Sequence, residues 1–184
     1  RQFASRTARA AAALGVSATF ADLFAAGKEQ RPFLIGACDW SIGKTGDVSG
    51  MELAREIGLD GLQISPGTER DDIKLRRPEV QQAYRDARQR LGIEIASLGF
   101  GELNNVPFKS DPRTVQWVGD VIDVCHALGR KVILIAFFGK GDLKNDPAGQ
   151  EEVVRRFKEL APKAEKLGVT LGIESWLNAE EHMA

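Results

Sequence analysis

Short apolar segments alternate with longer amphipathic segments along most of this chain. The apolar segments cover residues 32–38, 59–65, 93–98, 131–138 and 169–176. Each is apolar at nearly consecutive positions, which is typical of a strand buried on both faces of a parallel sheet. Successive segments begin about 30 to 40 residues apart, the length of a strand, a helix and their connections. The pattern therefore predicts five parallel strands joined by helices.

Helices are expected between these strands because apolar residues recur there at helical spacing. The three longest amphipathic segments begin near Pro78, Asp111 and Asp146 and end at Gly92, Gly129 and Gly168. Proline in the first turn and glycine just past the last turn are typical helix boundaries. A shorter helix is expected over residues 50–57.

Polar residues at the strand ends favour a barrel over a doubly wound sheet. Every apolar segment leads into polar residues, and no glycine-rich dinucleotide-binding motif follows the first one. Because five strands cannot close an eight-stranded barrel, we expect residues 31–184 to form a truncated N-terminal portion of a (β/α)8 TIM barrel, with about five βα units. The predicted fold class is α/β.

Residues 1–30 are predicted to be an export signal-like segment and a linker. Arginines precede a short apolar stretch, and Val16, Ser17 and Ala18 offer a small-residue cleavage site. The stretch resembles the end of a twin-arginine signal, which implies a periplasmic or otherwise exported protein. The alternative is an ordinary N-terminal amphipathic helix, in a cytoplasmic protein. No other segment approaches the roughly 18 apolar residues that span a membrane, so no membrane partner is expected after signal removal.

The composition is that of a globular protein and argues against one class of partner. Hydrophobic residues make up 43% and charged residues 28% of the 184 residues, and the net charge is −1. Lys and Arg are interspersed with Asp and Glu, so no basic stripe could neutralise a run of phosphates and no nucleic-acid partner is expected. Cys38 and Cys125 lack metal-binding spacing and are expected to be free thiols.

Candidate functional residues gather at the predicted strand ends, where α/β folds build their sites. Glu174 closes the last apolar run and suits a divalent ion or the removal of a proton next to a carbonyl group. Trp40 and Trp176 could stack on the apolar face of a sugar ring. Further candidates for contact with a substrate are Gln63, Glu102, Asn104, Phe138 and Lys140.

Each of these residues also has a purely structural explanation. A glutamate at a strand end often caps a helix or pairs with a lysine, and tryptophans often serve in packing. Lys140 beside Asp142 can form a solvated turn, and exposed loops routinely carry amides and carboxylates. The two histidines, His126 and His182, lie in or near predicted helices and are poorly placed for catalysis.

Two motifs carry a resemblance to a known family. They are Gly-Val-Thr-Leu-Gly-Ile-Glu-Ser-Trp at residues 168–176 and Phe-Phe-Gly-Lys-Gly-Asp at residues 137–142. From about Pro32 to its end, the chain resembles the xylose isomerase-like TIM barrel superfamily of sugar phosphate isomerases and epimerases. The resemblance implies that Glu174 is the first of four ligands to a divalent ion, Mn²⁺, Mg²⁺, Co²⁺ or Zn²⁺. It also implies that Glu180, six residues onward, contacts the substrate, as in keto-sugar epimerases of this superfamily.

The resemblance further implies an Asp, a His and a second catalytic Glu on later strands, which this sequence does not contain. Members of the superfamily often carry Glu on the second strand, where this chain has Gln63. Without the later ligands, these 184 residues alone are expected to be inactive.

Residues and resemblance together predict a metal-dependent isomerase or epimerase that acts on a sugar or sugar phosphate. The resemblance implies that Glu174 and the later Glu exchange a proton next to a carbonyl group, through an enediolate. One alternative is a non-catalytic carbohydrate-binding barrel. Another is an endonuclease IV-like hydrolase, whose basic DNA-contacting loops and several histidines are not visible here. The sequence allows a homo-oligomer.

Overall fold

The computed structural model describes residues 33–183. Nearly all of the described residues belong to one compact unit, Ile35–Ala184. The expected export signal-like segment, residues 1–30, lies outside the described residues and stays a prediction.

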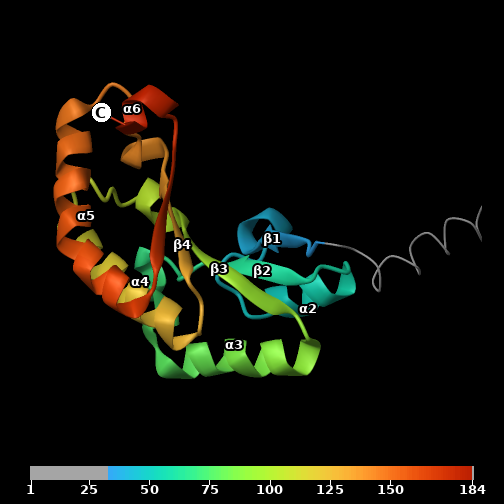
Figure 1. Cartoon of the computed structure of the whole chain (residues 1–184). Coiled ribbons are helices and arrows are strands. Elements are labelled where there is room, and N and C mark those ends of the chain that lie inside the picture. Colours follow the sequence, from blue (N-terminus) through green and yellow to red (C-terminus); the bar gives the residue numbers. More distant parts are fainter. Residues whose placement is uncertain (1–32, 184) are drawn as a thin grey trace, which may run out of the picture. The chain divides into compact units, whose positions relative to one another are not determined.

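Five parallel strands form one sheet in the order β1-β2-β3-β4-β5 (Figure 1). The strands are β1 (Gly36–Cys38), β2 (Gly61–Ile64), β3 (Glu94–Phe100), β4 (Val132–Phe137) and β5 (Thr170–Ser175). The predicted α/β class and the five predicted strands are therefore confirmed. β3 runs two residues past its predicted end, because Gly99 and Phe100 pair with Leu134 and Ile135 of β4.

Helices follow the strands in regular alternation. The α-helices are α2 (Gly50–Glu56), α3 (Pro78–Leu91), α4 (Arg113–Ala127), α5 (Pro147–Leu167) and α6 (Ala179–Met183). Short 3-10 helices also occur: η1 (Asp39–Ile42), η2 (Glu69–Asp71), η3 (Lys74–Arg76), η4 (Gly101–Asn104) and η5 (Gly139–Gly141). Within the described part of the chain, no helix is long and apolar enough to cross a membrane.

The boundaries of the long helices follow from local sequence. The carboxylate of Asp146 accepts a hydrogen bond from the backbone N–H of Gly149 at 3.0 Å and so caps the start of α5. Gly92 and Gly168 end α3 and α5 with φ of +65°, a left-handed conformation that glycine adopts without strain. The predicted boundaries of these helices are correct because they depend on neighbouring residues only.

Alternate residues of β4 divide between the helix layer and a cavity. Ile133, Ile135 and Phe137 are buried in the core with residues of the helices. Leu134 and Ala136 point to the opposite face, where they line a cavity. Figure 1 shows α3, α4 and α5 along one side of the sheet. The opposite face is therefore the one available to a ligand.

β5 departs from the prediction of burial on both faces. None of its residues is fully buried, and Ile173 and Glu174 are exposed. The reason is its position, because β5 lies at one edge of the described sheet, as β1 does at the other, and pairs only with β4 among the described strands. An apolar run predicts a strand, but the neighbours of that strand decide its burial.

A buried arginine anchors the loop that follows β3. The side chain of Arg156, on α5, is 6% exposed and donates to the carbonyl oxygens of Phe108 and Asp111, each at 2.7 Å. Beneath it, the rings of Phe108, Phe137 and Phe157 lie 5.1 to 6.3 Å apart. These contacts hold the β3 exit against α5 and the end of β4.

Candidate functional site

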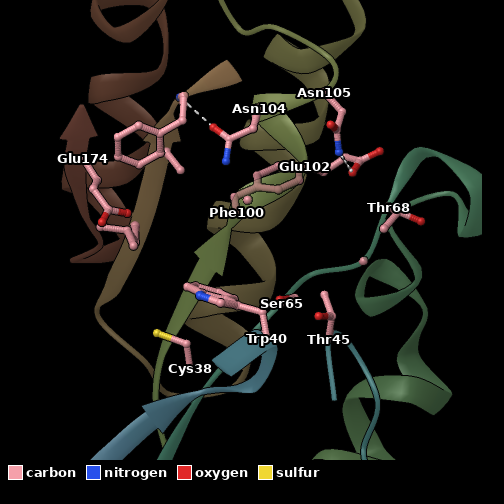
Figure 2. Close-up of a pocket in the computed structure, with 15 residues that line it drawn as sticks. Cys38, Trp40, Thr45, Ser65, Thr68, Phe100, Glu102, Asn104, Asn105 and Glu174 are labelled. Carbon is pink, nitrogen blue, oxygen red and sulfur yellow. Dashed lines mark hydrogen bonds between the residues drawn. The ribbon is translucent and has the colours of Figure 1, made fainter. Parts of the chain in front are cut away.

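A cavity of about 560 Å³ lies at the carboxyl ends of the strands (Figure 2). The exits of all five strands contribute to its wall, which includes Trp40, Phe100, Glu102, Asn104, Phe138 and Glu174. Five predicted substrate or catalytic residues are thus gathered in one place, namely Trp40, Glu102, Asn104, Phe138 and Glu174. The convergence follows from the topology, because parallel strands end at one edge of their sheet.

A buried carboxylate ties the exit of β1 to the exit of β2. Asp39 is 0% exposed, and its oxygens accept hydrogen bonds from the N–H of Gly46 at 2.8 Å and from the N–H and hydroxyl of Ser65 at 2.7 and 2.6 Å. These donors compensate the cost of burying the charge. Sequence reasoning did not find this role of Asp39, because its partners lie up to 26 residues away.

The indole of Trp40 lies against the backbone of β3. A Cβ atom added at Gly99 would lie 2.5 Å from Cη2 of Trp40 and 2.8 Å from Oε1 of Gln63. Only glycine therefore allows the ring to approach this closely. Trp40 remains 39% exposed and lines the cavity, so its free surface is available to a ligand.

Gln63 supports the wall rather than lining it. Its Nε2 donates to the hydroxyl of Ser97 at 2.7 Å, and its Oε1 accepts from the thiol of Cys38 at 3.2 Å. The carboxamide is therefore engaged at both ends, and Gln63 does not line the cavity. A register shift between Leu62 and Gln63 brings Gln63 opposite Ser97.

The thiol of Cys38 also belongs to the cavity wall. Burial raises its pKa, and the neighbouring charges of Asp39 and Glu174 raise it further. Cys38 is therefore a protonated hydrogen-bond donor at neutral pH and a weak nucleophile.

The exits of β3 and β4 are joined by a side chain. Oδ1 of Asn104 accepts a hydrogen bond from the backbone N–H of Phe138 at 2.7 Å. The ring of Phe138 in turn meets Trp176 edge-on, with centroids 5.1 Å apart. Trp176 is 66% exposed and does not line the cavity, unlike Trp40.

Glu102 stands between the main cavity and a smaller one. Its oxygens accept from the N–H of Glu69 and from Nδ2 of Asn105, both at 3.1 Å. The adjoining cavity, of about 460 Å³, is lined by Glu102 and by Lys140. The structure therefore places Lys140 beside the main cavity and not in its wall.

Glu174 presents its carboxylate to the cavity from the end of β5 (Figure 2). It lies opposite Ala136 in the register with β4 and is exposed. No described residue donates a hydrogen bond to it or forms an ion pair with it. In the part of the chain that the structure covers, Glu174 thus has none of the capping or pairing roles that explain many strand-end glutamates.

Glu180 and Glu181 differ sharply. Glu181 forms an ion pair with Lys144 and accepts a hydrogen bond from the N–H of Asn178, and the bond to Lys144 is the main reason that its pKa lies below its ordinary value. Glu180 is exposed and does not line the cavity. The predicted substrate contact of Glu180 stays a prediction.

The described residues offer an ion only part of a site. Across residues 33–183, no group of three or more His, Cys, Asp or Glu is arranged to hold a metal ion. The carboxylate of Glu174 can contribute an oxygen ligand but not a complete ligand set. These residues therefore do not form a metal site by themselves.

A parallel sheet with helices along one face and a cavity at its carboxyl edge defines an α/β protein of the barrel type. The sequence pattern of the xylose isomerase-like TIM barrel matches residues 51–183. The chain therefore belongs to the xylose isomerase-like TIM barrel family. Among curated proteins, none matches the sequence.

Solved structures show the extent of the similarity. A xylose isomerase domain protein from Planctomyces limnophilus is 18% identical, with a TM-score of 0.63, over 84% of this chain and 59% of that chain. A xylose isomerase-like TIM barrel protein from Mycobacterium smegmatis, in complex with magnesium, is 16% identical, with a TM-score of 0.60, over 77% of this chain and 55% of that one.

D-Psicose 3-epimerase from Clostridium cellulolyticum H10, solved with D-tagatose, is 18% identical. Its TM-score is 0.52, over 76% of this chain and 51% of that chain. At these identities the similarity establishes the fold alone. The chain spans a little over half the length of the three structures.

Proposed function

We propose that this chain provides the N-terminal half of a sugar isomerase or epimerase in which Glu174 exchanges a proton next to a carbonyl group. The observation that carries the proposal is the carboxylate of Glu174, which faces the cavity without a described hydrogen-bond or ion-pair partner. A carboxylate in that position can act on a ligand because it has no structural bond to break first. The family of the chain supports the same class of reaction.

The proton transfer needs few groups. The carboxylate of Glu174 takes the proton from the carbon beside the carbonyl. The electrons of that C–H bond form a C=C bond, and the π electrons of the carbonyl move onto its oxygen to give an enediolate. Return of a proton to the former carbonyl carbon, with a proton moved between the two oxygens, gives an isomer whose carbonyl has shifted, whereas return to the opposite face of the original carbon gives an epimer. A second acid, from beyond the described residues, would donate a proton to the opposite face of the substrate.

The wall of the cavity suits a polyhydroxylated ligand. The exposed surface of Trp40 can cover the C–H face of a sugar, while Glu102 and Asn104 offer polar atoms to its hydroxyl groups. The D-tagatose bound by the epimerase from Clostridium cellulolyticum H10 makes ketoses the first substrates to assay.

A divalent metal ion would assist the reaction in the whole protein by stabilising negative charge on the substrate's oxygens. The family resemblance and the magnesium in the Mycobacterium smegmatis structure support this part of the proposal. Glu174 would supply one ligand, and the others would come from beyond the described residues. The signal-like character of residues 1–30 supports a periplasmic site of action.

Deuterium exchange tests the proposal directly. With D-tagatose or D-fructose and Mn²⁺ or Mg²⁺ in D₂O, the whole protein, with the later strands that supply the other ligands and the second acid, should incorporate deuterium beside the carbonyl, as measured by ¹H NMR. Glu174→Gln preserves shape but removes the base, so exchange should slow at least about 100-fold. Glu165→Gln, an exposed substitution on α5, is the matched control and should exchange at the rate of the unchanged protein. Equal rates for the Glu174 variant and the unchanged protein would overturn the proposal.

A second candidate is sugar binding without catalysis. It is favoured by one observation, the exposed surface of Trp40 in the cavity wall, because stacking of an indole on a sugar needs neither a metal ion nor a base. This candidate predicts that a ketose binds, as measured by calorimetry, while no deuterium enters it under any metal condition.

A further inference from the structure

The side-chain amide of Asn104 has a fixed orientation. The backbone N–H of Phe138 is a donor only, so the atom of Asn104 that faces it at 2.7 Å must be the oxygen. The amide nitrogen therefore points the other way, into the cavity, as Figure 2 shows. No described residue accepts a hydrogen bond from this nitrogen.

The neighbouring amide, Asn105, behaves differently although the two residues are adjacent in sequence. Nδ2 of Asn105 donates one of its two hydrogens to Glu102 at 3.1 Å. Both residues line the cavity, but of the two nitrogens only that of Asn104 has no acceptor among the described residues. The difference arises because Asn104 faces Phe138 at the exit of β4, whereas Asn105 turns back to Glu102, three residues earlier in the same loop.

The backbone around Asn104 holds the donor in place. A Cβ atom added at Gly141 would lie 2.7 Å from the carbonyl oxygen of Leu103, and one added at Gly139 would lie 3.2 Å from that of Asn104. The two glycines therefore let η5 pack directly on η4. Because η4 packs on η5, the amide nitrogen of Asn104 loses little conformational freedom when it binds a ligand.

Among the charged and amide groups of the cavity wall, Asn104 supplies an uncharged hydrogen-bond donor. Glu102 and Glu174 present carboxyl oxygens that can accept hydrogen bonds, and no Lys or Arg lines the main cavity. A ligand with hydroxyl groups can donate to these carboxylates. Its remaining oxygen lone pairs need a donor, and an uncharged amide N–H supplies one without attracting an anion.

We propose that Asn104 is a specificity residue whose oxygen fixes the β4 exit and whose nitrogen donates to an oxygen of an uncharged, polyhydroxylated ligand. This inference rests on the proposed function, because it names the ligand contact of the same cavity. The side chain of Asn104 thus has a structural role, through its oxygen, and a ligand-binding role, through its nitrogen. A substitution can remove the second role and keep the first.

Asn104→Asp keeps an oxygen for the N–H of Phe138 but lacks the donor. The amide of Phe138 should stay as protected from hydrogen exchange as in the unchanged protein, whereas D-tagatose should bind about tenfold more weakly by calorimetry. Asn104→Ala removes both roles, so both protection and binding should fall. The whole protein that contains this chain is used throughout, with NMR to follow the exchange.

Arg70→Gln controls for the change of charge, because it makes the charge beside the cavity more negative by the same amount as Asn104→Asp at an exposed residue that lines only the adjoining cavity. It should weaken D-tagatose binding by no more than about threefold. Equal losses for Asn104→Asp and Arg70→Gln would overturn the donor role, and rapid exchange of the Phe138 amide in Asn104→Asp would overturn the structural role. A protein that binds D-tagatose with this pattern but exchanges no deuterium refutes the proposed catalysis and leaves the Asn104 assignment standing. Failure of the unchanged protein to bind a ketose refutes both.

Discussion

The two sides of the cavity are built in opposite ways. On the β1–β3 side, the polar side chains of Asp39 and Gln63 are engaged by other residues, and Trp40 is packed on Gly99. On the β5 side, Glu174 is exposed and forms no hydrogen bond or ion pair with any described residue. The first side is a rigid surface against which a ligand can rest. The second side holds a group that is available to react.

The largest effect is expected where the rigid side is most buried. Asp39→Ala leaves the N–H groups of Gly46 and Ser65 without their acceptor, so it should lower the free energy of unfolding by about 3 to 5 kcal/mol. Urea denaturation measures this loss. Asp123→Ala removes an exposed ion pair with Lys163 and should cost less than about 1 kcal/mol.

If Asp39→Ala does not fold, Asp39→Asn keeps one acceptor oxygen and should give a smaller but measurable loss. If replacing Asp39 lowered the free energy of unfolding no more than replacing Asp123 does, the carboxylate of Asp39 would not be what holds the β1–β3 side of the cavity in place.

An intermediate effect is expected from Gly99→Ala, because the new methyl group would displace Trp40 or Gln63. We expect a loss of about 1 to 3 kcal/mol in unfolding free energy and a changed near-ultraviolet circular dichroism signal from the indole. Gly172→Ala is the matched control in β5, where the nearest contact of an added Cβ atom is an ordinary 3.8 Å. Identical behaviour of the two variants would show that Trp40 is not held against β3.

The smallest effect on stability is expected at Glu174. Glu174→Gln breaks no described hydrogen bond or ion pair, so the free energy of unfolding should change by less than about 0.5 kcal/mol. Thermal denaturation checks this expectation. A loss above about 1 kcal/mol would reveal a structural role for Glu174 and remove the contrast between the two sides.

Much of the fold was predictable because its signals are local. The apolar runs, Asp146 at the start of α5 and Gly168 at its end were all recognisable from neighbouring residues. The site was predictable in outline, since strand ends of a parallel sheet converge. The family resemblance added a role for Glu174 that its position in the sequence could only suggest.

Other features could not be predicted because they depend on contacts between distant residues. The choice between Trp40 and Trp176 as the cavity residue depends on the packing of Trp40 against Gly99 and of Trp176 against Phe138. Gln63 was expected to meet a substrate, yet its partners Cys38 and Ser97 lie 25 and 34 residues away. The residues around Gln63 in the sequence do not predict its contact with Cys38 or with Ser97.

The sequence by itself determined the five strands, their helices and the polar character of their exits, because hydrophobic periodicity and helix boundaries are properties of short segments. Only the tertiary structure decided which polar groups form hydrogen bonds within the protein and which remain available to a ligand. Asp39 and Gln63 are hydrogen-bonded to other residues, whereas Glu174 and the nitrogen of Asn104 have no described partner. The physical reason is that hydrogen bonds act over about 3 Å, so the neighbours in space assign each donor and acceptor its partner.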